Sequence, residues 1–251
     1  MRPAGKKAFI AYVMGGDPDL DMTREYILAM EGAGADIIEV GIPFSDPIAE
    51  GEVIQRANVR ALASRTDIDG LFAMVRSLKG EVRAPILFMT YLNPVFRYGY
   101  ARFFEGCEQC GVCGVIVPDM PFEEQGELLP FAEEHHVDVI TLIAPTSRAR
   151  IGRAAEGAVG FIYLVSSMGT TGARDSIRTD IGGIVSEIRR HTDIPVAVGF
   201  GIHNPSQAAS LSELADGVIV GSAIVKLVEE HGRDAGGAIA EYIREMKKAM
   251  E

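Results

Sequence analysis

Short runs of apolar residues recur along the chain, and a segment with helical periodicity follows each of them. The runs are continuous rather than alternating, which is typical of parallel strands that are covered on both faces. We therefore expect eight strands, at Ala8–Met14, Ile37–Val40, Pro85–Met89, Gly114–Pro118, Asp138–Ile143, Gly160–Val165, Pro195–Gly199 and Gly217–Val220. The segments between and after them predict helices at Leu20–Glu31, Val53–Ala63, Leu71–Leu78, Ala101–Cys110, Glu123–Glu134, Ala149–Ala155, Ile181–Arg190, Pro205–Leu214 and Ala235–Met250, two of them in the second connection.

This alternation predicts an α/β fold of the closed (β/α)8, or TIM barrel, type. Residues 1–251 have the usual length of one such barrel, so we expect a single (β/α)8 barrel domain. The alternative is a doubly wound open sheet, whose first strand usually leads into a G-x-G-x-x-G turn. Here the first strand ends in Gly15-Gly16-Asp17-Pro18, which lacks that spacing. The barrel is therefore favoured.

The net charge of −11 limits the partners. An acidic surface argues against nucleic acid and against anionic membranes. It leaves a phosphorylated substrate open, because backbone amides can bind phosphate without a basic side chain. The chain shows neither a signal peptide nor an apolar run long enough to cross a membrane, so we expect a cytoplasmic protein.

The three cysteines, Cys107, Cys110 and Cys113, have a C-x2-C-x2-C spacing that iron–sulfur clusters also use. There is no fourth cysteine, and no histidine lies near them in the sequence. We therefore expect no metal site and interpret the three as small buried apolar residues.

The segment Ile37–Gly51, IIEVGIPFSDPIAEG, is the most informative part of the chain. Glu39 lies within an apolar strand, where a carboxyl is costly unless it is paired or functional. Burial would raise its pKa and keep it protonated as a general acid, whereas a place at the wet end of the strand would make it structural. Asp46 and Glu50 follow in a loop, where a catalytic and a solvated carboxylate are equally compatible with the composition.

Glycines at the ends of two consecutive predicted strands indicate a phosphate site. Gly201 follows the seventh strand, and Gly221-Ser222 follows the eighth, just before a helical turn. Their backbone N–H groups and the helix end could hold an anion. The polar segment Ser166–Asp180 follows the sixth strand and is either a lid, in which Gly172 closes the same pocket, or an ordinary surface loop.

With these residues set out, the chain resembles the α subunit family of tryptophan synthase over nearly its whole length. The resemblance rests on ordered motifs, of which the first is the most specific: Glu39-Val40-Gly41-Ile42-Pro43-Phe44-Ser45-Asp46-Pro47, Ile54-Gln55-Arg56-Ala57-Asn58, Gly16-Asp17-Pro18, Thr90-Tyr91-Leu92-Asn93-Pro94, Val117-Pro118-Asp119, Gly169-Thr170-Thr171-Gly172-Ala173-Arg174, Gly199-Phe200-Gly201-Ile202 and Val220-Gly221-Ser222-Ala223.

The resemblance implies cleavage of indole-3-glycerol phosphate to indole and glyceraldehyde 3-phosphate by general acid–base catalysis, with no cofactor in this chain. It implies catalytic roles for Glu39 and Glu50. The remaining site residues that it implies bind substrate at Tyr12, Met89, Ile116, Ile143, Tyr163, Thr171 and Phe200, bind phosphate at Gly172, Gly201, Gly221 and Ser222, and contact a partner at Pro43, Phe44, Asp46 and Asn93. That partner is a β subunit carrying pyridoxal phosphate, in an α2β2 complex.

Two departures from the family pattern matter. The second acid is usually aspartate, whereas here it is Glu50, followed by Glu52 where proline is common. The longer side chain reaches about 1.5 Å further, which predicts a shifted loop, a low intrinsic activity or a different substrate. We expect from the sequence that Glu50→Asp is tolerated or improves the rate. The family usually has a helix before the first strand, whereas Met1–Lys7 alone precede it here.

Two other functions stay open at this point. Another phosphate-binding barrel enzyme, such as a sugar-phosphate isomerase, would share the glycine loops but would not need the Pro-Phe-Ser-Asp-Pro loop. A mainly regulatory subunit, whose chief task is to activate a β partner, would tolerate Glu50 in place of aspartate.

Overall fold

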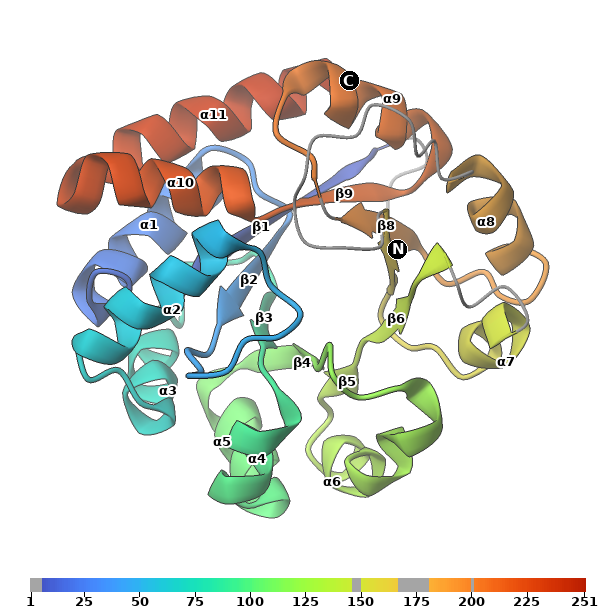
Figure 1. The fold of residues 1–251 in the computed structure, drawn as a ribbon, viewed down its shortest axis with the longest axis horizontal. Helices are drawn as coiled ribbons and strands as arrows, with labels where there is room; N and C mark the ends of the chain where they lie inside the picture. The colour runs from blue at the N-terminus through green and yellow to red at the C-terminus, as the bar shows by residue number, and fades with distance from the viewer. Residues whose placement is uncertain (1–5, 146–149, 167–180, 200) are drawn as a thin grey trace.

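The computed structural model describes residues 6–145, 150–166, 181–199 and 201–251. Its strands form one parallel sheet, and helices form an outer ring around them (Figure 1). The strands are β1 (Ala8–Met14), β2 (Ile37–Gly41), β3 (Ile86–Met89), β4 (Val112–Ile116), β5 (Asp138–Val139), β6 (Thr141–Ile143), β7 (Ile162–Val165), β8 (Val196–Gly199) and β9 (Gly217–Val220).

The sheet closes on itself, although its order, β5-β4-β3-β2-β1-β9-β8-β7-β6, has two formal ends. These ends are consecutive in the chain and are separated only by Ile140, whose N–H donates to the carbonyl of Val115 at 2.9 Å. One extended segment thus pairs with β4 through its first half and with β7 through its second. The predicted closed barrel is confirmed, and the predicted strand Asp138–Ile143 is divided in two.

The helices are α1 (Leu20–Gly32), α2 (Glu52–Ala63), α3 (Ile68–Ser77), α4 (Leu92–Tyr98), α5 (Tyr100–Cys110), η1 (Phe122–Glu127), α6 (Leu129–Glu134), α7 (Ile151–Glu156), α8 (Ile181–Ile188), α9 (Pro205–Leu214), α10 (Ser222–His231), η3 (Gly232–Asp234) and α11 (Ala235–Ala249). Both helices predicted for the second connection are present. The predicted helix Glu123–Glu134 is instead a 3₁₀ segment followed by a short α-helix that has a proline in its first turn.

The sequence missed α4 and predicted only a turn of α10. In α4 the motif Asn93-Pro94 suggests a loop, but a proline in the first turn of a helix sacrifices no hydrogen bond. Strand β4 also begins two residues earlier than predicted. None of these differences changes which strand ends meet at the mouth of the barrel.

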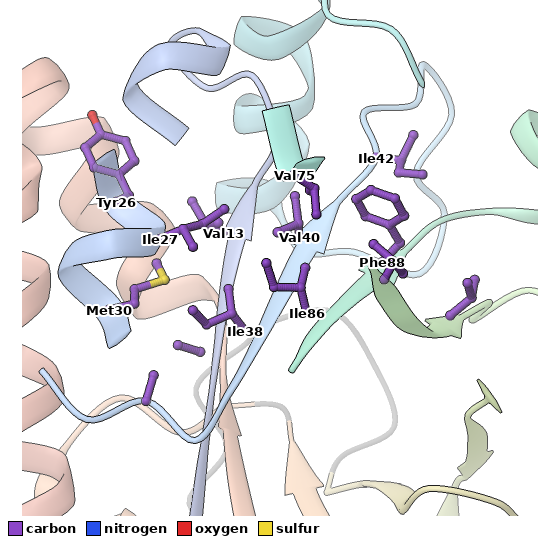
Figure 2. Close-up of a cluster of buried hydrophobic side chains, with 14 of the residues drawn as sticks. Val13, Tyr26, Ile27, Met30, Ile38, Val40, Ile42, Val75, Ile86 and Phe88 are labelled. Carbon is purple, nitrogen blue, oxygen red and sulfur yellow. The ribbon is translucent and has the colours of Figure 1, made fainter. Parts of the chain in front are cut away.

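Alternate residues of β1 face opposite layers. Phe9, Ala11 and Val13 pack in the layer between the sheet and the helices, whereas Ile10, Tyr12 and Met14 pack inside the barrel. Figure 2 shows the outer layer, where Ile27 and Met30 of α1 lie near Val13 of β1 and Ile38 of β2. Because Ile38 and Val40 face this layer, Glu39 between them faces the interior.

Ion pairs tie α2 to neighbouring elements. Arg60 donates to both carboxylate oxygens of the buried Asp17, at 2.8 and 2.7 Å. Arg56 donates to both oxygens of Glu229 on α10, at 2.6 and 2.9 Å. Helix α2 begins directly after the Glu50 loop. These two-point contacts hold it against the loop that follows β1 and against α10.

No helix in the described ranges is both long enough and apolar enough to cross a membrane.

Candidate active site

Glu39 lies in the barrel interior, as the sequence predicted. It is paired in register with Tyr12 of β1 and Leu87 of β3, and it is only 1% exposed. Its Oε2 atom has no hydrogen-bond partner among the described residues. Burial, and then the charge of Glu50, raise the pKa of Glu39 to about 8. Glu39 therefore keeps its proton at neutral pH.

Glu50 turns from its loop into the same interior and is 4% exposed. The side-chain amide of Asn58 donates from Nδ2 to Glu50 Oε2 at 2.7 Å. Burial raises the pKa of Glu50 to about 7, and the Asn58 hydrogen bond opposes that rise by favouring the charged form. Glu50 ionises first, and its charge then discourages ionisation of Glu39. Between pH 7 and 8 the pair thus combines a carboxylate base with a carboxylic acid.

The loop that carries Glu50 is pinned from two sides. Asn58 accepts a hydrogen bond from the backbone N–H of Phe44 at 2.8 Å, through Oδ1. Tyr91, just after β3, accepts one from the N–H of Ala49 at 2.9 Å, and its ring centroid lies 5.2 Å from that of Phe44. The carboxyl of Glu50 is therefore held by a loop fixed at both of its ends.

Asn58 and Tyr91 belong to motifs set out from the sequence, which assigned them no role in the site. Asn58 is 2% exposed and lies on the same buried helix face as Ala57 and Ala61. A polar residue on the apolar face of an amphipathic helix is the signal that could have singled it out. Asp119, the last residue of the Val117-Pro118-Asp119 motif, accepts a hydrogen bond from the N–H of Leu92 at the start of α4.

Two inward-facing tyrosines lean over glycines at strand ends. A Cβ atom on Gly41 would lie 2.2 Å from Tyr12 Oη, and one on Gly199 would lie 2.5 Å from Tyr163 Oη. Only glycine leaves room for these rings at the mouth of the barrel. Met89 and Ile116 belong to the same interior cluster as the two tyrosines, so four of the predicted substrate contacts line one space.

Ile143 is not brought to that cluster. It packs with Ile151 of α7 and Ile184 of α8 in the outer layer, because its register partner Leu164 also faces the helices. Leu142, paired with Tyr163, is the residue of β6 that packs against the interior cluster. Phe200, Thr171, Gly172 and the candidate lid beyond Ser166 lie outside the described residues.

The predicted phosphate residues lie at neighbouring strand ends. Strands β8 and β9 pair Ala197 with Gly217, and with this offset Gly201 and Gly221 follow their strands at equivalent positions. Gly221 is the N-cap of α10, and no side chain of the described residues caps that helix. Gly201 has a φ of +77°, and a Cβ atom there would meet no described residue within 4 Å. The first N–H groups of α10, which have no partner within the helix, and its positive end suit an anion.

The residues predicted to meet a partner surround the Glu50 loop. Asp46 and Asn93 are exposed, Phe44 is half-buried and Pro43 is buried. Two apolar side chains that the sequence had not singled out, Ile48 on the loop and Phe96 on α4, are 78% and 66% exposed. Exposed apolar side chains beside an active-site loop are typical of a protein interface.

The cysteines differ in burial. Cys107 and Cys110 are buried and free, as expected, whereas Cys113 near the start of β4 is free but exposed. Within the described ranges, no group of three or more histidine, cysteine, aspartate or glutamate residues is placed to hold a metal ion.

Comparison with known proteins agrees with this geometry. The sequence profile of the family described as "Tryptophan synthase alpha chain" matches residues 1–251. The tryptophan synthase alpha chain of Lacticaseibacillus casei is 45% identical over 245 residues, which cover 98% of this chain and 92% of the relative. That of Methanosarcina mazei is 47% identical over an alignment of 254 residues, covering 100% of this chain and 91% of the relative.

Solved structures show the same fold. A structure of Mycobacterium tuberculosis tryptophan synthase superimposes with a TM-score of 0.88 at 36% identity, covering 98% of this chain and 93% of that one. Tryptophan synthase subunit alpha from Legionella pneumophila gives a TM-score of 0.87 at 34% identity, with coverage of 98% and 93%.

The raised pKa of Glu39 makes stability depend on pH. Unfolded Glu39 ionises near pH 4.5, while the folded side chain keeps its proton to about 8, so the folded state loses stability as pH rises between these values. We expect Glu39→Gln to remove this loss and to gain roughly 3–5 kcal/mol over wild type between pH 4.5 and 8. Urea unfolding at several pH values measures the free energy of unfolding of both proteins, and Glu241→Gln, at an exposed position, is the control. Parallel pH profiles for Glu39→Gln and wild type would contradict the assignment.

Proposed function

The chain belongs to the tryptophan synthase alpha chain family, and from this premise we propose that Glu39 and Glu50 are its catalytic acid and base. The activity is cleavage of indole-3-glycerol phosphate in tryptophan biosynthesis, a carbon–carbon lyase reaction. The family needs no cofactor in this subunit, and pyridoxal phosphate belongs to the β subunit. Family membership decides against a sugar-phosphate isomerase.

One observation supports the assignment above the others: two buried carboxyl groups with raised pKa values face one interior space, and Asn58 favours the charged form of Glu50 alone. Protonated Glu39 gives its proton to the ring carbon that carries the glycerol chain. The adjacent chain hydroxyl gives its proton to Glu50 and becomes the aldehyde carbonyl. The electron pair of the broken carbon–carbon bond returns to the ring, and indole leaves. A proton passing from Glu50 to Glu39 restores the starting state.

We assign the phosphate to the mouth of β8 and β9, at Gly201, Gly221 and Ser222. The uncapped N-terminus of α10 supports this place, since its N–H groups can bind an anion without a basic side chain. We assign the indole ring to the apolar cluster of the barrel interior, around Met89 and Ile116. The single sheet that joins the nine strands of the described ranges supports one domain over residues 1–251.

The activity should follow the two carboxyls. We expect kcat/KM for indole release to rise through a pKa of about 7 and to fall above about 8, because Glu50 must be ionised and Glu39 protonated. Glu39→Gln should lower kcat by about 100- to 10,000-fold with an intact fold. An assay of indole release from indole-3-glycerol phosphate measures the rates, and circular dichroism measures whether the variant is folded. A Glu39→Gln variant that retains turnover would remove this residue from the mechanism.

For Glu50→Asp, the contact with Asn58 supports a loss of activity rather than the tolerance expected from the sequence. The shorter side chain withdraws the carboxylate by about 1.5 Å from an amide that now lies at 2.7 Å. We expect kcat/KM to fall by about ten- to a hundredfold. Glu52→Asp, the same change at an exposed neighbour, serves as control. Equal activities of wild type and Glu50→Asp would contradict this expectation and show that the loop can place the carboxylate of either residue in the site.

As an alpha chain, the protein is a component of tryptophan synthase, and similar solved structures are of that complex. We propose that it forms an α2β2 complex through the surface around the Glu50 loop, with Pro43, Phe44, Asp46 and Asn93. The exposed Ile48 and Phe96 support this surface, because both would leave water on association.

We expect Ile48→Ser to weaken binding to the β subunit by about tenfold, since it removes a large apolar contact. Calorimetric titration of this chain with the β subunit measures the dissociation constant. Leu214→Ser is the matched control, because Leu214 is also exposed but ends α9, at the opposite rim of the barrel. Equal losses for both variants would contradict this surface. Comparing turnover with and without the β subunit also tests a mainly regulatory role.

A further inference from the structure

Three buried polar side-chain atoms lack a hydrogen-bond partner among the described residues. They are Tyr12 Oη, Glu39 Oε2 and Tyr242 Oη. Tyr242 lies on α11 in the outer ring, whereas Tyr12 and Glu39 are register partners that face the interior. Most buried polar groups in folded proteins are paired, so two unpaired atoms on neighbouring residues of the barrel interior point to a ligand that pairs with them.

The position of Tyr12 sets which part of a ligand it meets. Strand β1 lies between β9 and β2 in the sheet. A Cβ atom on Gly221, after β9, would lie 3.3 Å from Tyr12 Cδ1, and one on Gly41, after β2, would lie 2.2 Å from Tyr12 Oη. The ring thus extends from the phosphate side of the mouth to the acid side, and its hydroxyl reaches the level of Gly41, beyond Glu39.

A substrate that joins the two sides must pass this ring. Its path rests on the proposed function, in which the phosphate sits at Gly221 and the indole ring beside Glu39. The glycerol chain then crosses β1, and its hydroxyl next to the indole ring comes to the end of the Tyr12 side chain. That hydroxyl is the one whose proton Glu50 removes.

We propose that the Tyr12 hydroxyl donates a hydrogen bond to this chain oxygen and stabilises the negative charge that develops on it as its proton passes to Glu50, before the carbon–carbon bond has broken. The oxygen loses its proton to Glu50 and becomes the aldehyde carbonyl, while Tyr12 keeps its own proton throughout. A fixed donor aimed at developing charge in a site with little water is among the largest single contributions to catalysis.

The surroundings keep Tyr12 a donor. Burial raises its pKa well above the ordinary value, and the nearby Glu50, Glu39, Tyr91 and Tyr163 raise it further. Its hydroxyl therefore carries a proton over the whole working range of the two acids. Because that hydroxyl has no acceptor among the described residues, its removal sacrifices no contact within them.

Tyr12→Phe removes the hydroxyl alone and is the test. We expect kcat/KM for indole-3-glycerol phosphate to fall by about ten- to a hundredfold, mostly in kcat. The melting temperature should stay level or rise, because a buried unpaired hydroxyl is lost. Tyr242→Phe makes the same change at an orphaned hydroxyl outside the site and should leave the kinetics as in wild type.

A second measurement separates the hydroxyl contact from a change in pocket shape. The probe is a substrate analogue in which each CH(OH) group of the glycerol chain is replaced by CH₂. Its chain offers Tyr12 no acceptor, so wild type and Tyr12→Phe should bind it with equal dissociation constants. Wild-type turnover by Tyr12→Phe, or weaker binding of this analogue by the variant, would overturn the proposal. Failure of wild type itself to release indole would instead overturn the proposed function on which it rests.

Discussion

Glu39 and Glu50 lie in one interior space where little water remains to solvate a second negative charge. Burial penalises ionisation of each carboxyl, and the first charge penalises the second. The pair is therefore held with one proton over a narrow pH range, so that a single space offers an acid and a base together. The rest of the site is built to keep these two groups apart in pKa and fixed in position.

The fold achieves this through different elements for each group. Glu39 is fixed by a strand of the barrel, whose alternation leaves it no other direction than inward. Glu50 sits on a loop, and its position depends on Asn58 and Tyr91. Asn58 belongs to α2, and Arg56 of α2 is paired with Glu229 of α10, so hydrogen bonds link the acid side of the site to the helix on its phosphate side.

Periodicity along the sequence predicted the barrel and the rim that carries the site. A lone Glu39 in an apolar strand and glycines at consecutive strand ends pointed to that rim. Contacts that depend on tertiary approach could not be predicted in this way, since nothing local says that Asn58 reaches both Glu50 and Phe44. Ile143 shows a related difficulty, because the division of its strand at Ile140 sets which face Leu142 and Ile143 adopt.

The polar atoms of Tyr12 and Glu39 that lack a partner among the described residues lower the stability of the fold, and ligand binding gives the reason for them. Orphaned groups at Tyr12 and Glu39 oppose folding, so their burial must be offset by the apolar layers on either side of the sheet. Selection for stability alone would favour apolar residues at both positions. The hydroxyl of Tyr242, on the outer helix α11, also has no partner among the described residues. What distinguishes Tyr12 and Glu39 is geometry: a donor and an acid are register partners that face the barrel interior, and Gly41 leaves room for the Tyr12 ring between them and the mouth.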